Sequence, residues 1–309
     1  MRNLHGAMEG IKQSSHAGAE CIPVLITPFT YGGELDLSAL DRILSYYKKN
    51  SIQRLWVLGT GGEDMALTYN QRQELARFLL SEERKNMFEY MIGASFYSFK
   101  ETLTFIDLLN ELDCSTAHYM IYNQLISEEH CLSLYKKIKN NFAGKLYAYS
   151  SANWGKELST SLVKKLAEEG FAGIKYSTSN IVNTQTVLNE ANGNFEVIPA
   201  VVKQLLPSLS LGAKSFTTVE ASVFLEDITS LVNEFTAGKL EMAKECQFKL
   251  NKKIKDSTLS PTKSNFLRLA EIKSIMEHNK LCQRWLAPGY EQITQVEFNK
   301  LEYFNIDEN

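Results

Sequence analysis

The stretch IPVLITPFTYGGELDLSALDRILSYYKKNSIQRLWVLG, residues 22–59, contains a complete strand–helix–strand pattern. Its first part, 22–29, is an apolar run rich in β-branched residues and predicts a buried strand, and RLWVLG at 54–59 predicts a second one. Between them, five apolar residues repeat at helical spacing over 37–49: Leu37, Leu40, Ile43, Leu44 and Tyr47. Two buried strands joined through a helix predict a pair of parallel strands.

The same alternation continues to about residue 237 and gives about eight strand–helix units. An open doubly wound sheet and a (β/α)8 TIM barrel both fit such a pattern, but the number of units and their total length favour the barrel. No GxGxxG motif follows the first strand, which removes the main sequence evidence for a dinucleotide-binding sheet. We therefore predict an α/β fold with an N-terminal tail at 1–20, a barrel at 21–237 and a C-terminal helical segment at 238–309 packed on the barrel.

The C-terminal segment contains no strand pattern. Residues 239–255, 263–279 and 294–304 each predict a helix. The middle one carries an apolar stripe that predicts a packing surface: Phe266, Leu269, Ile272, Ile275 and Met276.

The composition is that of an ordinary globular protein, with 44% hydrophobic residues, 22% charged residues and a net charge of −3 in 309 residues. This charge does not favour nucleic acid or an anionic membrane as a partner. The sequence contains neither a membrane-spanning apolar run nor the apolar core of a secretory signal. Its cysteines and histidines have no metal-binding or redox spacing. We expect a cytoplasmic protein with free thiols, no metal and no cofactor.

One lysine lies where a charge is not expected. In EGFAGIKYSTSN, residues 169–180, Lys175 belongs to a short apolar strand. Two interpretations are open: a strand-end lysine that reaches water or pairs with a carboxylate, and a reactive amine in a dry site. In the second, burial lowers the pKa of the amine, and the neutral form can condense with a ketone to a Schiff base.

Other polar groups follow the strands that neighbour Lys175 in the predicted barrel. The sequence GTGGE at 59–63 follows the second strand, and its glycines predict either a flexible turn or a cradle of backbone N–H groups for an anion. Tyr122 ends the fourth strand, and Tyr147 and Tyr149 lie on the fifth. Active sites of barrels lie at the carboxyl ends of the strands, so these groups are expected near Lys175.

Taken in order, IPVLITPF with GELD, VLGTGGE, YN after the fourth strand, and GIKYS resemble the dihydrodipicolinate synthase/N-acetylneuraminate lyase family. LPSLSLGAKSFTT and FTAGKLEMAKECQFKLN extend the resemblance, which covers about 22–290. It implies a class I, Schiff-base pyruvate aldolase on a (β/α)8 barrel with C-terminal helices, usually a homotetramer built from tight dimers. The implied partner is a small 2-oxo acid.

The resemblance also implies roles for individual residues. Lys175 matches the Schiff-base lysine, and Tyr149 matches the tyrosine that acts as general acid and base beside it. Thr60 matches the hydroxyl that relays protons to that tyrosine. Tyr122 matches the tyrosine that crosses the tight-dimer interface in many members. Candidate substrate-binding residues are Gly61, Gly62 and Thr217, the last from FTTVEA after the eighth strand.

The chain also departs from the family pattern. Gly61 stands where members carry a second hydroxyl that helps to hold the pyruvate carboxylate, which leaves backbone N–H groups at Gly61 and Gly62 for this task. After Tyr149, the sequence SSANWG lacks the arginine with which the synthases bind the carboxylate of their second substrate; Asn153 and Trp154 stand nearby. After the seventh strand, VIPAV replaces the Gly-Asp type of sequence that is usual in the family, which changes the floor of the substrate pocket.

These departures favour a lyase or aldolase whose substrate is sugar-acid-like or sialic-acid-like. The alternatives are a 4-hydroxy-tetrahydrodipicolinate synthase-like enzyme and a binding or regulatory homologue with impaired catalysis.

Overall fold

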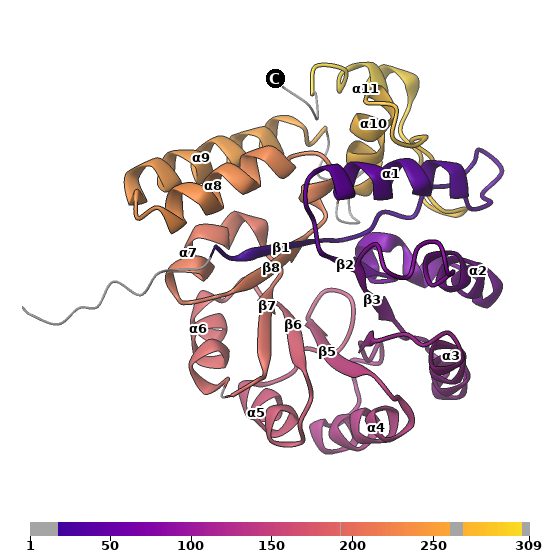
Figure 1. Cartoon of the computed structure of the whole chain (residues 1–309). Helices are drawn as coiled ribbons and strands as arrows, with labels where there is room; N and C mark the ends of the chain where they lie inside the picture. Colours follow the sequence, from indigo (N-terminus) through magenta and orange to yellow (C-terminus); the bar gives the residue numbers. More distant parts are fainter. Residues whose placement is uncertain (1–17, 192, 260–267, 305–309) are drawn as a thin grey trace, which may run out of the picture.

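The computed structural model describes residues 18–191, 193–259 and 268–304. Its strands are parallel and lie at the centre of the molecule, with helices around them (Figure 1). The strands are β1 (Glu20–Pro23), β2 (Arg54–Val57), β3 (Glu89–Gly93), β4 (Thr116–Tyr119), β5 (Lys145–Ser151), β6 (Gly173–Ser177), β7 (Glu196–Pro199) and β8 (Ser215–Thr218). Strands β2 to β7 pair in sequence order, and β1 pairs with β8.

The two sheets join into a closed barrel at both seams. Between β1 and β2, the Leu25 N–H donates to the Trp56 carbonyl at 2.9 Å, and Val24 forms a parallel bridge with Trp56. Between β7 and β8, the Ser215 hydroxyl donates to the Glu196 carboxylate at 2.5 Å. The predicted (β/α)8 barrel is therefore confirmed.

A helix follows every strand: α1 (Leu37–Lys49), α2 (Tyr69–Leu79), α3 (Phe99–Glu111), α4 (Glu128–Asn141), α5 (Thr160–Glu168), α6 (Ile181–Glu190), α7 (Leu205–Ser210) and α8 (Leu225–Thr236). Six of them begin after a residue whose side-chain oxygen accepts a hydrogen bond from a backbone N–H of the first turn. These caps are Asp36, Thr68, Ser98, Ser127, Ser159 and Asn180. Such caps satisfy N–H groups that a helix leaves unpaired at its start, which fixes where each helix begins.

Three further helices follow the barrel: α9 (Leu240–Asp256), α10 (Leu269–His278) and α11 (Gln295–Asn299). Helix α9 packs along α8, while α10 and α11 lie beyond α1 (Figure 1). The predicted apolar stripe is buried at Leu269, Ile272, Ile275 and Met276, and Phe266 lies outside the described residues.

Several predicted elements have different bounds in the structure: the strand expected over 54–59 ends at Val57, and the helix expected over 294–304 covers only Gln295–Asn299. The first strand begins at Glu20 and ends at Pro23, and residues 24–29 continue as a buried segment held by single bridges. The prediction of a continuous helix over 263–279 is wrong at Arg268, because this residue has a left-handed backbone with φ of 57°. A side-chain-bearing residue in that conformation cannot continue a right-handed helix, so α10 begins at Leu269.

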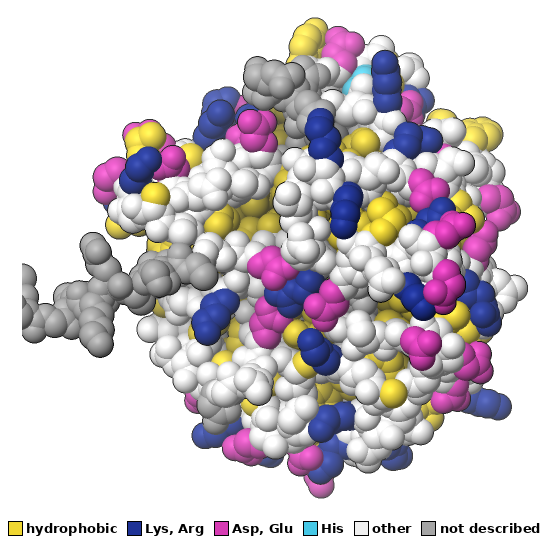
Figure 2. Space-filling view, viewed as in Figure 1, with side chains coloured by type: hydrophobic (Ala, Val, Ile, Leu, Met, Phe, Trp, Pro, Cys, Tyr) yellow, Lys and Arg dark blue, Asp and Glu magenta, His cyan; other side chains and the backbone are white. Residues whose placement is uncertain are grey.

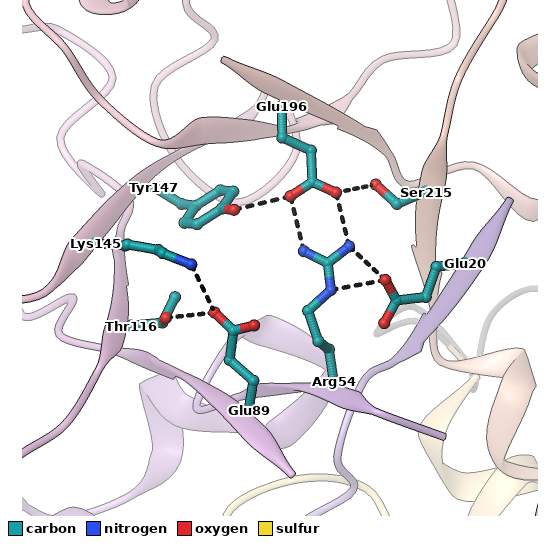
Figure 3. A network of polar contacts seen from close by, with 8 residues as sticks. All are labelled: Glu20, Arg54, Glu89, Thr116, Lys145, Tyr147, Glu196 and Ser215. Atoms are coloured by element: carbon teal, nitrogen blue, oxygen red, sulfur yellow. Dashed lines mark hydrogen bonds and ion pairs between the residues drawn. The ribbon is translucent and has the colours of Figure 1, made fainter. Parts of the chain in front are cut away.

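Acidic and basic side chains gather at the centre of one end of the barrel (Figure 2). Arg54 begins β2 and donates two hydrogen bonds of 2.7 Å to Glu196 at the start of β7, and its Nε donates to Glu20 at 3.0 Å (Figure 3). Tyr147 also donates to Glu196, at 2.8 Å. Burial opposes the charge of Glu196, but the hydrogen bonds from Arg54 and Ser215 lower its pKa. This network closes the amino-terminal end of the barrel, where TIM barrels carry stabilising residues.

No helix in the described part of the chain is long and apolar enough to span a membrane. All five cysteines, Cys21, Cys114, Cys131, Cys246 and Cys282, are free thiols.

Candidate active site

Lys175 lies inside the barrel on β6, with 4% of its surface exposed. Its Nζ is 4.3 Å from the centroid of the Tyr149 ring and 4.9 Å from that of Trp56. Among the described residues, no carboxylate forms an ion pair with it. Burial lowers the pKa of Lys175 to about 7, against a smaller opposing effect of the Asp64 charge. A large fraction of this amine is therefore neutral and nucleophilic near neutral pH.

Tyr149 lies beside Lys175 because the two residues are register partners on β5 and β6. Its hydroxyl is 2.9 Å from the Thr60 hydroxyl, and both groups are buried. Burial raises the pKa of Tyr149, so the phenol keeps its proton at neutral pH. A protonated phenol linked to a second hydroxyl can give a proton and recover one through that hydroxyl.

An aromatic wall lies beside the Lys175 amine. His118 stacks on Trp56 with ring centroids 3.9 Å apart, and Trp56 meets Tyr149 edge-on at 5.7 Å. His118 Nε2 is 2.9 Å from the Val57 carbonyl. Burial, helped by the charge of Lys175, holds the pKa of His118 well below its usual value. The imidazole is therefore neutral and adds no competing charge beside Lys175. Sequence reasoning did not identify Trp56 or His118.

The glycines after β2 form a short 3-10 helix, Thr60–Gly62. Gly61 lines the cavity above Lys175. A Cβ at this position would lie 2.3 Å from Val219 Cγ1 and 2.8 Å from Val24 Cγ1. Two valines thus occupy the space that a side chain at residue 61 would need. The Gly62 N–H donates to the Gly59 carbonyl at 2.7 Å, so this donor is already used within the loop.

Glu63 ties this loop to the C-terminal helices. It has a left-handed backbone with φ of 58° and is completely buried. Its carboxylate pairs with Lys273 of α10, which is also completely buried, and accepts the Ala287 N–H at 2.7 Å. Since unpaired buried charges are costly, this pair fixes the position of the loop against α10.

Tyr122 lies at the edge of the site and outside the cavity. It is 6% exposed, and its hydroxyl donates to the carboxylate of Asp64. Burial raises the pKa of Asp64, although the nearby Arg72 opposes this effect. On the other side, the exposed ring of Tyr97 packs on Tyr122 with centroids 4.8 Å apart. Asp64, which sequence reasoning missed, follows directly after Glu63.

A cavity of about 290 Å³ opens over Lys175. Its wall includes four other predicted site residues, namely Tyr149, Thr60, Gly61 and Thr217, but not Gly62 or Tyr122. The Thr217 hydroxyl is buried and has no hydrogen-bond partner in the described part of the chain. Sequence reasoning missed two basic residues on the wall, Lys203 and Arg268, whereas the acidic Glu220 belongs to the FTTVEA segment already noted after the eighth strand. Within the described ranges, no group of three or more His, Cys, Asp or Glu side chains could hold a metal ion.

Known proteins resemble this chain over most of its length. Residues 18–294 match the model of the dihydrodipicolinate synthetase family. The 4-hydroxy-tetrahydrodipicolinate synthase of Hydrogenobaculum sp. (strain Y04AAS1) is 26% identical over 233 residues, which are 74% of this chain and 79% of the relative.

Two solved structures share the fold. Dihydrodipicolinate synthase from Bacteroides thetaiotaomicron has a TM-score of 0.84 and 22% identity, and the alignment covers 93% of this chain and 97% of that one. YagE, a prophage protein of the dihydrodipicolinic acid synthase family from E. coli K12 in complex with pyruvate, has a TM-score of 0.82 and 18% identity, with coverages of 92% and 96%.

Proposed function

Because the chain belongs to the dihydrodipicolinate synthetase family, we propose that it is a Schiff-base-forming lyase that makes or breaks a carbon–carbon bond. Its substrate is pyruvate or a related 2-oxo acid. The observation that carries this proposal is the buried Lys175 amine, with its pKa lowered to about 7, beside the hydrogen-bonded hydroxyls of Tyr149 and Thr60. YagE, a structural neighbour, is described in complex with pyruvate, which supports this choice of substrate.

In the proposed reaction, the neutral Nζ of Lys175 attacks the keto carbon of the 2-oxo acid. The resulting carbinolamine loses water as Tyr149 transfers a proton to the departing hydroxyl, and an iminium forms. The iminium withdraws electrons from the adjacent carbon, which allows its bond to the next carbon to break or form. Tyr149 is left as a phenolate, and Thr60, hydrogen-bonded to it, relays a proton back to restore the phenol.

Gly61 and Thr217 are the proposed contacts of the 2-oxo acid carboxylate. Both line the cavity, and the Thr217 hydroxyl has no other hydrogen-bond partner among the described residues. A hydrogen bond to a charged group contributes about 1.5–3 kcal/mol. A hydrogen bond from Thr217 therefore replaces much of the binding energy that a hydroxyl at residue 61 would supply.

The rest of the substrate is proposed to be sugar-acid-like or sialic-acid-like, because SSANWG after Tyr149 carries no arginine for a synthase-type second substrate. The second candidate is a 4-hydroxy-tetrahydrodipicolinate synthase-like activity. It is favoured by the name of the relative from Hydrogenobaculum. A synthase-like activity requires a cation elsewhere in the cavity to bind the carboxylate of the second substrate.

We also propose a homo-oligomer, a dimer or a tetramer. The exposed Tyr97 ring on Tyr122, together with Leu125 in the same loop region, leaves apolar surface beside the site. Light scattering of the purified chain measures the mass directly, and a monomer at micromolar concentration contradicts this proposal.

The decisive experiment is reductive trapping. The protein is incubated with pyruvate and a panel of 2-oxo acids, reduced with borohydride, digested and analysed by mass spectrometry. We expect the mass of one reduced 2-oxo acid on Lys175, and none on the Lys175→Arg variant. A folded protein that carries no adduct with any acid of the panel contradicts the proposed function.

A further inference from the structure

The cavity over Lys175 has a cationic outer wall that lies away from β5. Two of its residues are basic, Lys203 after β7 and Arg268 before α10, and one is acidic, Glu220 after β8. Lys203 is exposed at the rim, whereas the Arg268 side chain is only 12% exposed. The cavity thus offers positive charge on its β7–β8 side, in addition to the amine of Lys175.

The Arg268 guanidinium is only partly used by the protein. Its Nη2 donates to the Ser257 hydroxyl, and its Nη1 is 3.8 Å from the Glu220 carboxylate. In the described part of the chain, Nε and Nη1 have no hydrogen-bond partner. Glu220 forms an ion pair with Arg268 but no hydrogen bond, because 3.8 Å separates Nη1 from the nearer carboxylate oxygen, and its other oxygen accepts the Thr218 hydroxyl.

An arginine that is largely buried and keeps unused N–H donors is unusual. Burial lowers the pKa of Arg268, and the charges of Glu220 and Glu271 compensate only in part. The group nevertheless remains charged, because an arginine side chain is not deprotonated in proteins. A buried charge with unused donors costs stability unless a ligand completes its contacts. This arginine also lines the same cavity as Lys175.

We propose that Arg268, assisted by Lys203, binds a second anionic group of the substrate, a carboxylate or a phosphate at the end remote from the keto carbon. This inference rests on the proposed function and narrows its substrate class to anionic aldehydes or their 2-oxo acid adducts. The planar guanidinium matches either anion, with two parallel N–H donors. The chain thus has a cation for this group on the α9–α10 side of the cavity instead of after β5.

The position of Arg268 also determines the direction of the bound substrate. The carboxylate next to the keto carbon is proposed to contact Gly61 and Thr217, while the remote anion points toward Lys203 after β7 and Arg268 before α10. Arg268 lies immediately before α10, whose Lys273 holds the Gly61 loop through Glu63. The packing of α10 therefore bears on both Arg268 and the Gly61 loop.

The test compares matched aldehydes in condensation with pyruvate. One pair is succinic semialdehyde and butyraldehyde, and the other is glyceraldehyde 3-phosphate and glyceraldehyde. We expect kcat/KM for the anionic member of one pair to exceed that for its neutral partner by about 10- to 100-fold, the range that one or two hydrogen bonds to a charge provide. The pair that shows the preference identifies the anion as carboxylate or phosphate.

The variants Arg268→Gln, Arg268→Lys and Arg77→Gln are measured in parallel. Arg268→Gln should lose most of the preference, Arg268→Lys should retain part of it, and Arg77→Gln, at an exposed site on α2, should retain all of it. The pyruvate adduct on Lys175 and the melting temperature are measured for each variant, so that loss of folding is recognised. If the adduct forms and the wild type shows no preference, or if Arg268→Gln slows both members of a pair equally, the inference is overturned while the proposed function stands.

A binding measurement tests Arg268 even if no adduct forms and the proposed function fails. Tryptophan fluorescence, to which the cavity residue Trp154 contributes, is titrated with glutarate and with its uncharged-end analogue glutaramate. Tighter binding of glutarate by the wild type, lost in Arg268→Gln, supports an anion site. Equal binding of the two ligands by the wild type overturns it.

Discussion

Adding a methyl group at Gly61 should destabilise the protein through a specific contact with Val219. The new Cβ would lie 2.3 Å from Val219 Cγ1 and 2.8 Å from Val24 Cγ1, well inside van der Waals distance. Overpacking of this kind costs about 1–3 kcal/mol, so we expect the free energy of unfolding of Gly61→Ala to fall by that amount. Urea unfolding measures the change.

A double-mutant cycle assigns this loss to the valine. Val219→Ala removes two buried methyl groups and should cost about 1.6 kcal/mol, from about 0.8 kcal/mol for each group. It also removes the closest contact of the new Cβ. We therefore expect the double variant to be at least about 1 kcal/mol more stable than the sum of the single changes predicts.

Gly62→Ala provides the matched control. A Cβ there would lie 3.2 Å from the Leu25 carbonyl oxygen and would not approach Val219, so its effect should add to that of Val219→Ala. Additivity within about 0.5 kcal/mol for the Gly61 pair would refute the view that Val219 fills the space of the missing side chain.

Three further outcomes follow from the site and the barrel end. Adduct formation on Lys175 should accelerate as the pH rises through about 7 and level off above it, because only the neutral amine attacks the keto carbon. A midpoint near the ordinary pKa of lysine would contradict this prediction. Tyr149→Phe should reduce turnover by about 10²- to 10⁴-fold with an unchanged melting temperature, whereas an unchanged rate would exclude proton transfer by this phenol. Arg54→Met should lower the free energy of unfolding by about 3 kcal/mol, because Glu196 then loses its two 2.7 Å hydrogen bonds from Arg54. The double variant Arg54→Met/Glu196→Gln should recover part of this loss in the same urea assay, because it also removes the unpaired charge.

Much of the fold follows from local patterns in the sequence. The helix predicted over 37–49 has the same bounds as α1, because Asp36 caps its start and the apolar spacing continues to Tyr47. The grouping of Lys175, Tyr149 and Thr60 also follows from the sequence, since parallel strands in sequential order bring their carboxyl ends together. Their close contacts then depend on register, which pairs Tyr149 with Lys175.

Other parts of the site depend on contacts between distant segments. The sequence indicates that residue 61 lacks a hydroxyl. The valines that fill the space directly follow β8 and β1, and they are 158 and 37 residues away along the chain (219 − 61 and 61 − 24). Arg268 falls within a predicted helix, where its helical spacing gives no sign of the left-handed residue that starts α10. Its place on the cavity wall is set by the packing of α10, which local patterns do not determine.

The buried pair of Glu63 and Lys273 has a consequence for the order in which the protein matures during synthesis. All eight strands have been synthesised by residue 218, but the partner of Glu63 emerges from the ribosome only 55 residues later (273 − 218). Until then, the loop after β2 carries a carboxylate without its lysine, and the cavity lacks Arg268. A nascent chain that ends between residues 218 and 268 therefore contains all eight strands but lacks both the lysine that pairs with Glu63 and the arginine of the cavity wall.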